Sequence, residues 1–123
     1  MRCRYGVGVD LQGSIYTAET ENDVTTYLTE GVGEDFWPET VDFKIVDTYE
    51  MVDDAEAFAM TRRLADEESI LAGGSSGMAV VGALRVAKER PHDLIVVLLP
   101  DSGRNYLSKI FNDDWMREHG LLD

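Results

Sequence analysis

The chain has 123 residues, of which 44% are hydrophobic, and this suits one domain with a core of modest size. Eleven basic and 24 acidic residues give a net charge of −13, which repels nucleic-acid phosphates and anionic membrane surfaces. The single cysteine, Cys3, has no partner for an internal disulfide, and residues 94–100 are too short an apolar run to cross a membrane. No signal-peptide pattern follows Arg2 and Arg4. We therefore expect a cytoplasmic protein that binds neither nucleic acid nor membrane.

The first third of the chain predicts one strand and a long irregular segment. Residues 5–10 alternate in the way a strand does, and residues 10–29 have no sustained periodicity, which indicates a loop. Gly31 and Gly33 then precede two aromatic residues and Pro38, so a tight turn is expected. This glycine pair alone is weak support for a phosphate loop, because no helix follows it.

Residues 48–69 predict a strand followed by a helix. Residues 48–52 are short and β-prone, and Asp53 with Glu56 three positions later has the spacing of a capping box. We expect the helix to run to about Ser69. Its apolar side consists of Ala57, Phe58, Met60, Thr61, Leu64 and Ala65.

A glycine-serine loop at residues 73–77 separates this helix from a second one, expected over residues 78–88. Glycine lets backbone approach a ligand closely, and a following helix directs unpaired N–H groups and a partial positive charge at it. The alternative interpretation is that Ser75 or Ser76 merely caps the second helix. The second helix is apolar nearly all round, which predicts burial on more than one side.

The last part of the chain predicts a buried strand and two short helices. Residues 94–99 are continuously apolar, as in a parallel-sheet strand that is covered on both faces. A turn at residues 101–106 leads into a short helix, and Asn112 or Asp113 is expected to cap a last helix that Gly120 ends. The order of elements predicts an α/β layered domain, in which ligands bind at the carboxyl ends of strands.

The residues alone give little support to a metal site or to a serine hydrolase. His92, His119 and Cys3 have no metal-ligand spacing, so no metal site is expected. Gly73, Ser75 and Gly77 satisfy the G-x-S-x-G pattern of serine hydrolases, but neither histidine lies in the context of a triad partner. A serine hydrolase therefore remains a minor alternative.

Several motifs together resemble the cysteine synthase/cystathionine β-synthase family of pyridoxal-phosphate enzymes. The resemblance covers about residues 8–122. It rests on Glu30-Gly31-Val32-Gly33, Asp35-Phe36, Pro38, Glu67-Glu68, Gly73-Gly74-Ser75-Ser76-Gly77, residues 98–109 with the run Pro100-Asp101-Ser102-Gly103-Arg104-Asn105-Tyr106, and residues 111–116. The run from Pro100 matches cystathionine β-synthase better than cysteine synthase.

This resemblance implies a partial layered domain of the tryptophan-synthase-β-like fold, which is fold type II. It implies pyridoxal 5′-phosphate as cofactor, with the hydroxyl of Ser75 donating to the pyridine nitrogen. A hydroxyl can donate to a neutral nitrogen, and the positive end of a helix dipole disfavours pyridinium. The other cofactor-binding residues that it implies are Gly73, Gly74, Gly31, Gly33, Asp101 and Ser102.

The Schiff-base lysine and the glycine-threonine phosphate loop of the family have no match here. Lys44, Lys88 and Lys109 all stand in other contexts, so no catalytic residue is assigned. We interpret residues 1–123 as the C-terminal part of a catalytic domain with no second domain. Glu34 stands where some relatives have tyrosine, which leaves its role in substrate handling open.

The expected function is part of a lyase of transsulfuration, which joins serine and homocysteine into cystathionine for cysteine biosynthesis. We expect the chain alone to be inactive, and the full-length family member to be a homodimer that takes small amino-acid substrates. One alternative is cysteine synthase, which uses O-acetylserine and sulfide. An alternative of another class is a non-catalytic remnant or interaction module.

Overall fold

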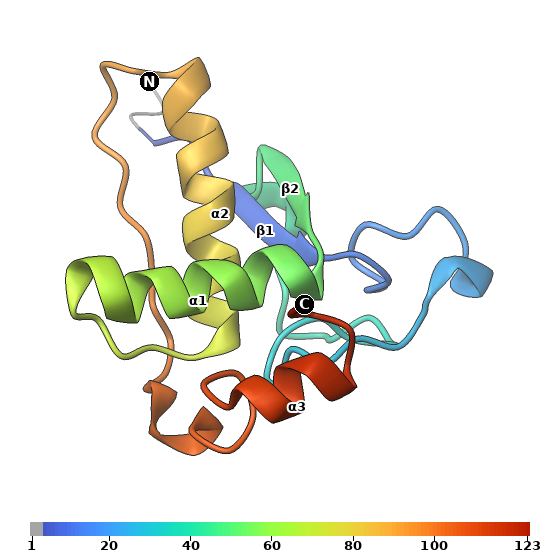
Figure 1. Ribbon diagram of the computed structural model, residues 1–123. Coiled ribbons are helices and arrows are strands. Elements are labelled where there is room, and N and C mark those ends of the chain that lie inside the picture. Colours follow the sequence, from blue (N-terminus) through green and yellow to red (C-terminus); the bar gives the residue numbers. More distant parts are fainter. Residues whose placement is uncertain (1–3) are drawn as a thin grey trace.

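The computed structural model describes residues 4–123 (Figure 1), so Cys3 lies outside the described residues. In chain order the strands and α-helices are β1 (Val7–Leu11), β2 (Thr48–Val52), α1 (Asp54–Glu68), α2 (Gly74–Glu89) and α3 (Asp113–Glu118). Single 3₁₀ turns occupy Glu21–Asp23, Phe43–Ile45 and Gly103–Tyr106.

The strands β1 and β2 form a parallel pair, with Val7 opposite Thr48 and Leu11 opposite Val52. Both predicted strands are thus confirmed, and so is the long irregular segment between them. That segment is held by scattered backbone bonds, such as Ile15 N to Glu34 O at 2.9 Å. It therefore folds back on itself with two 3₁₀ turns and no α-helix.

Helix α1 begins as the sequence predicts. The backbone N–H of Glu56 donates to Asp53 Oδ1 at 2.8 Å, and the Glu56 side chain accepts from the Asp53 backbone N–H. The helix ends at Ser69, whose φ of 59° lies in the left-handed region. The capping box and the predicted end of the helix are both confirmed.

Helix α2 begins at Gly74, four residues before its predicted start, so most of the predicted glycine-serine loop is helical. The reason lies in packing against α1. A Cβ added to Gly77 would lie 2.2 Å from the backbone oxygen of Ala57, so this glycine lets the two helices approach closely. In Figure 1, α1 crosses α2, which in turn covers β1. A stable contact of this kind outweighs the weak helix propensity of glycine and serine.

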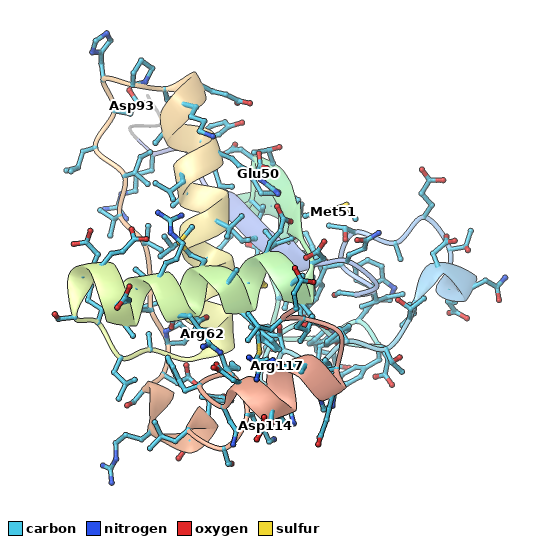
Figure 2. The ribbon with its side chains drawn as sticks, in the orientation of Figure 1. Glu50, Met51, Arg62, Asp93, Asp114 and Arg117 are labelled. Carbon is cyan, nitrogen blue, oxygen red and sulfur yellow. The ribbon has the colours of Figure 1, made fainter. Side chains whose placement is uncertain are left out.

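The core lies where the helices meet the carboxyl end of the sheet. It contains Leu11, Val52, Ala57, Phe58, Met78, Val81, Tyr106, Ile110 and Met116. Of the two expected caps Asn112 and Asp113, Asn112 caps helix α3, because its Oδ1 accepts from the backbone N–H of Trp115 at 3.1 Å. Arg62 of α1, labelled in Figure 2, lies between α1 and α3 and pairs with Asp113 of α3. This ion pair ties the end of the chain to the helical layer.

The predicted strand at residues 94–99 is wrong. The segment has no regular secondary structure, and the side chains of Leu94, Val96 and Leu98 are 92%, 87% and 81% exposed. A continuously apolar strand needs neighbouring strands and a layer on each face. Within residues 4–123 the sheet has only two strands. The apolar segment therefore lacks the neighbouring strands and the covering layers that a buried strand requires. The molecule is thus a small α/β assembly with an open side.

Candidate functional site

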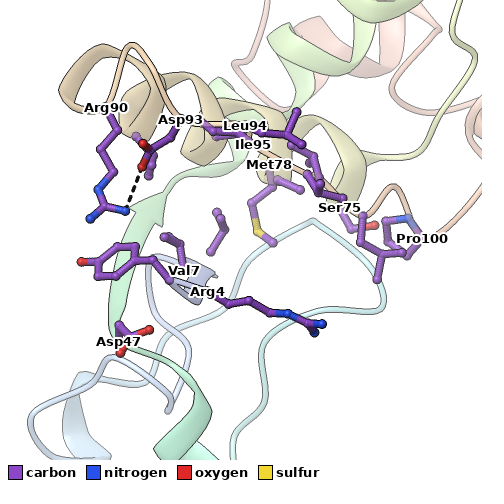
Figure 3. A pocket seen from close by; sticks show the side chains of 18 of the residues that line it. Arg4, Val7, Asp47, Ser75, Met78, Arg90, Asp93, Leu94, Ile95 and Pro100 are labelled. Carbon is purple, nitrogen blue, oxygen red and sulfur yellow. Dashed lines mark hydrogen bonds and ion pairs between the residues drawn. The ribbon is translucent and has the colours of Figure 1, made fainter. Parts of the chain in front are cut away.

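A hollow of about 1280 Å³ lies between β1, α2 and the extended segment at residues 94–100 (Figure 3). Val7 and Val9 line it from β1, and Met78, Ala79 and Ala83 line it from α2. The segment from Leu94 to Leu98 forms the opposite side. The predicted buried strand therefore borders the open space of the site.

The two ends of the hollow differ in chemistry. At one end the guanidinium of Arg90 lies 4.0 Å from the centre of the Tyr5 ring and bonds to Asp93 at 3.1 Å. Ser75 and Pro100 lie at the other end, as Figure 3 shows. Since β1 and the segment 94–100 both begin near Arg90, they run in the same direction. Ser75 thus lies toward their carboxyl ends, where parallel sheets bind ligands.

Ser75 is in the first turn of α2 and is 5% exposed. Its hydroxyl has no hydrogen-bond partner among residues 4–123, and no acidic side chain occupies the first turn. The helix is capped by the backbone of Gly73, without a side-chain hydrogen bond. Neither Ser75 nor Ser76 is the N-cap residue, so the interpretation of these serines as simple caps is wrong. Ser75 is a largely buried residue that borders the hollow, whereas the hydroxyl of Ser76 is fully buried and has no partner among the described residues.

Gly73 and Gly74 hold this first turn against the core. The hydroxyl of Thr61 donates to the backbone oxygen of Gly73 at 3.1 Å. A Cβ on Gly74 would lie 2.8 Å from the ring of Phe58, so only glycine fits there without movement of the core. The two glycines therefore fix where the helix begins and leave Ser75 as the side chain that faces the hollow.

The turn with Gly31 and Gly33 reaches the hollow through the residue between them. Both glycines have positive φ, 76° and 67°, and Val32 lines the hollow. Glu30, which precedes the turn, pairs with Lys109. The predicted tight turn is confirmed, and its backbone conformation requires glycine at both positions.

Asp101 lies against the start of α2. Its carboxylate occupies the space that a Cβ on Gly73 would need, and its Oδ2 accepts from the Tyr106 hydroxyl at 2.7 Å. Burial, together with the bond to Asp101, raises the pKa of Tyr106 to about 12. The second oxygen of Asp101 is buried and has no partner among the described residues. Ser102 instead caps the next helical turn, because its Oγ accepts from the backbone N–H of Arg104 at 3.4 Å.

Glu34 lies beside two tyrosines on the irregular segment. Burial raises the pKa of Tyr16 and of Tyr27, and the negative charge of Glu34 adds to both shifts. The backbone of Glu34 bonds to the Ser14 hydroxyl at 3.3 Å. The carboxylate of Glu34 therefore helps keep these phenols protonated.

The structure brings most of the predicted site residues to the start of α2. Ser75, Gly73 and Gly74 share one turn, and Asp101 touches it. Gly31 and Gly33 hold Val32 at the hollow. Ser102 caps the 3₁₀ turn that follows it, and its backbone forms an isolated antiparallel bridge with Ala72, the residue before Gly73. The roles of Val32 and Thr61 at the site were not predicted. In the sequence, Val32 resembles an ordinary turn residue and Thr61 an ordinary helix residue. Only Thr61 gave a signal in the sequence. A hydroxyl on the apolar side of α1 could have indicated a hydrogen bond to the segment packed against it, which is the bond to Gly73.

The two histidines lie away from the hollow. His92 is exposed, and the His119 ring stacks on Trp115 at 4.1 Å. The part of the chain that the structure describes has no group of three or more His, Cys, Asp or Glu side chains able to hold a metal ion. In residues 4–123, none of the helices combines the length and the apolar composition needed to span a bilayer.

Comparison with known proteins places this geometry in context. The family described as "Pyridoxal-phosphate dependent enzyme" matches residues 5–101. The cystathionine beta-synthase of Dictyostelium discoideum is 48% identical over 120 residues, which are 95% of this chain and 24% of that protein. The Oryctolagus cuniculus protein of the same name is 44% identical over 95% of this chain and 22% of its own length. The Saccharomyces cerevisiae protein is 39% identical over 95% of this chain and 24% of its own. The chain spans about a quarter of the length of these relatives.

Proposed function

Because the chain belongs to the family of pyridoxal-phosphate-dependent enzymes, we propose that it forms the wall of the cofactor site that faces the pyridine nitrogen. The reaction proposed for the complete enzyme is that of cystathionine β-synthase, in which the thiol of homocysteine replaces the hydroxyl of serine. The similarity to three proteins of that name supports this choice over cysteine synthase. The substrates are thus small amino acids.

The Ser75 hydroxyl is the observation that carries the proposal. Ser75 is only 5% exposed, it borders the hollow, and the described residues offer its hydroxyl no acceptor. A hydroxyl can donate to a neutral ring nitrogen, and a donor on the wall of the hollow gains a partner when a ligand with an acceptor binds there. The chemistry of this donor therefore fits the ring of the cofactor.

When bound, pyridoxal phosphate supplies an electron sink for the negative charge that develops on the substrate carbon. Helix α2 directs its positive end at the same place as Ser75, and this end disfavours a proton on the ring nitrogen. Ser75 therefore holds the ring neutral and keeps the sink weak. This bias favours loss and replacement of the β-substituent.

The neighbouring residues have supporting roles in the proposal. Gly73 and Gly74 place the first turn of α2 within reach of the ring, and Gly31 and Gly33 present backbone from the opposite turn. Asp101, fixed by Tyr106, sets the position of Gly73. Ser102 shapes the loop that follows Asp101.

The covalent attachment of the cofactor is proposed to lie outside this chain. Lys109 pairs with Glu30, and neither Lys44 nor Lys88 lines the hollow. We therefore expect the isolated chain to be inactive, and we propose that the complete enzyme is a cytoplasmic homodimer. The competing proposal is a non-catalytic interaction module, which would retain the fold without needing Ser75.

A chimeric enzyme tests the proposal directly. This chain replaces the matching segment of the Dictyostelium discoideum relative, and synthesis of cystathionine from serine and homocysteine is measured. We expect an active chimera, and Ser75→Ala should lower the rate about tenfold, the effect of losing one buried hydrogen bond. Ser108→Ala is the matched control, because Ser108 is exposed and away from the hollow.

The isolated chain provides the complementary measurement. The chain is mixed with pyridoxal phosphate and treated with borohydride, and lysine adducts are counted by mass spectrometry. We expect no specific adduct. A single lysine modified stoichiometrically, or a folded chimera that binds cofactor and has equal activity with Ser75→Ala, would contradict the proposal.

A further inference from the structure

Tyr106 and Asp101 form a hydrogen-bonded pair beside the start of α2. The Tyr106 hydroxyl donates to Asp101 Oδ2 at 2.7 Å, and the Tyr106 side chain belongs to the core, where it is 8% exposed. The other oxygen of Asp101, Oδ1, is buried and has no hydrogen-bond partner among the described residues. Within residues 4–123, the Tyr106 hydroxyl is thus the hydrogen-bond donor that fixes this carboxylate.

The backbone places this pair next to the first turn of α2. An antiparallel bridge between Ala72 and Ser102 joins the segment of Asp101 to the segment before the helix. A Cβ added to Gly73 would lie 2.2 Å from Asp101 Oδ1, so the carboxylate touches the backbone of Gly73. Gly73 is the N-cap of α2, and Ser75 lies in the first turn of the same helix. The carboxylate therefore lies close to the turn that carries Ser75.

Asp101 brings a negative charge to a place where the proposed function needs a neutral ring. Among the described residues that line the hollow, the carboxylates are Asp47 and Asp93, and Figure 3 shows both at the end away from Ser75. A negative charge within about 4–6 Å of a ring nitrogen favours its protonated form. An Asp101 side chain free to move would therefore favour pyridinium, and this opposes the effect of Ser75 and of the helix dipole.

The Tyr106 hydroxyl prevents such a movement. Without it, both oxygens of Asp101 would lack a donor, and a buried unpaired carboxylate is strongly unfavourable. A protonated ring nitrogen would offer that carboxylate a donor and an opposite charge. The other carboxylate whose charge acts on Tyr106 is Glu30, and it already pairs with Lys109. Asp101 is thus the carboxylate whose position depends on Tyr106.

We propose that Tyr106 is a positioning residue for the cofactor ring, because its hydroxyl holds the Asp101 carboxylate at Gly73 and away from the ring nitrogen. The nitrogen therefore stays unprotonated and accepts from Ser75. This inference rests on the proposed function and adds to it a second pair of residues that controls the charge of the ring.

The test follows the proton on the ring nitrogen in the chimeric enzyme, loaded with pyridoxal phosphate that carries ¹⁵N in its ring. The ¹⁵N chemical shift is recorded over a pH series for the parent, for Tyr106→Phe and for Tyr106→Phe combined with Asp101→Asn. In Tyr106→Phe we expect the nitrogen to take up its proton at a pH about one unit higher than in the parent, because an opposite charge has moved nearby. In the double variant we expect the titration of the parent, because asparagine carries no charge.

Tyr49→Phe is the matched control. It removes the hydroxyl of a half-buried tyrosine that lies near another carboxylate, Asp10, and does not line the hollow. Its ¹⁵N titration should equal that of the parent. Phenylalanine keeps an aromatic ring in the core at position 106, and circular dichroism will show that each variant folds.

A measurement on the isolated chain checks the pair without cofactor. Burial and the bond to Asp101 raise the pKa of Tyr106 to about 12. Asp101→Asn removes the negative charge, so the Tyr106 pKa should fall, as NMR of the tyrosine rings will show. An unchanged Tyr106 pKa would show that the two side chains do not interact, and the inference would fail.

Two further results would overturn this inference alone. Tyr106→Phe could titrate as the parent does, or the double variant could keep the raised titration of Tyr106→Phe. In both cases the parent nitrogen would be unprotonated and sensitive to Ser75→Ala, so the proposed function would stand. A protonated nitrogen in the parent would instead overturn the proposed function and this inference together.

Discussion

Single residues at the crossing of α1 and α2 set the position of the candidate site. Gly77 has no side chain to keep the helices apart, and Thr61 bonds both to Ala57 and to Gly73 across the same contact. The first turn of α2, with Ser75, therefore stays where the crossing puts it. Substitutions at this contact should lower the stability of the fold more than they change the binding of a ligand.

Gly77→Ala is the most direct test of this contact. The new Cβ would lie 2.2 Å from Ala57 O and from Thr61 Oγ1, so the helices must separate. We expect the free energy of unfolding to fall by about 1–3 kcal/mol, measured by urea denaturation. Lys88→Ala, at an exposed position of the same helix, should change it by less than about 0.5 kcal/mol. Equal stability of the Gly77 variant and the parent would show that the crossing is loose.

Tyr106 predicts a dependence of stability on alkaline pH. Its pKa is raised to about 12 in the folded chain, against about 10 in an unfolded one, so the folded state keeps the phenol proton longer. The resulting stability is present below pH ~10 and is lost as pH rises toward 12. Denaturation at a series of alkaline pH values should show a fall that is smaller for Tyr106→Phe. An identical fall in parent and variant would exclude this role for Tyr106.

At the scale of elements, the sequence predicted correctly those features that depend on hydrogen bonds between residues close in sequence. The Asp53 cap was predicted, and Asn112 was one of the two caps expected for α3, because each cap depends on neighbours within a few positions. The predicted strand at residues 48–52 forms because its partner β1 lies within the described residues. The start of α2 was predicted too late, because contact with α1 outweighs the preference of Gly74 and Ser75 for a loop. The failure at residues 94–99 has another cause: a strand depends on partners far away in sequence.

The cap of α1 can be tested by itself. Asp53→Ala removes the acceptor for the Glu56 backbone N–H, and we expect a loss of about 1 kcal/mol in the free energy of unfolding. Asp53→Asn keeps an acceptor and should restore most of that stability. Thermal unfolding of the three proteins measures the series. If Ala and Asn variants melt alike, the capping bond does not support α1.

For the whole molecule, the candidate site was predictable in part. The family resemblance indicated Ser75, and the structure shows this residue largely buried at the edge of the hollow, with no partner for its hydroxyl within residues 4–123. The roles of Val32 and Thr61 could not be predicted, because they depend on how the turn at residues 31–33 and helix α1 approach α2. Within residues 4–123 the two-stranded sheet leaves one side of the molecule open, and Ser75 borders the hollow on that side.

The state of the cofactor ring nitrogen tests this account most directly. Pyridoxal phosphate labelled with ¹⁵N in the ring is bound to the chimeric enzyme, and the nitrogen signal is recorded by NMR. We predict the chemical shift of an unprotonated nitrogen that accepts a hydrogen bond, and a change in that shift with Ser75→Ala but not with Ser108→Ala. The shift of a protonated pyridinium, or a signal that Ser75→Ala leaves unchanged, would contradict the account.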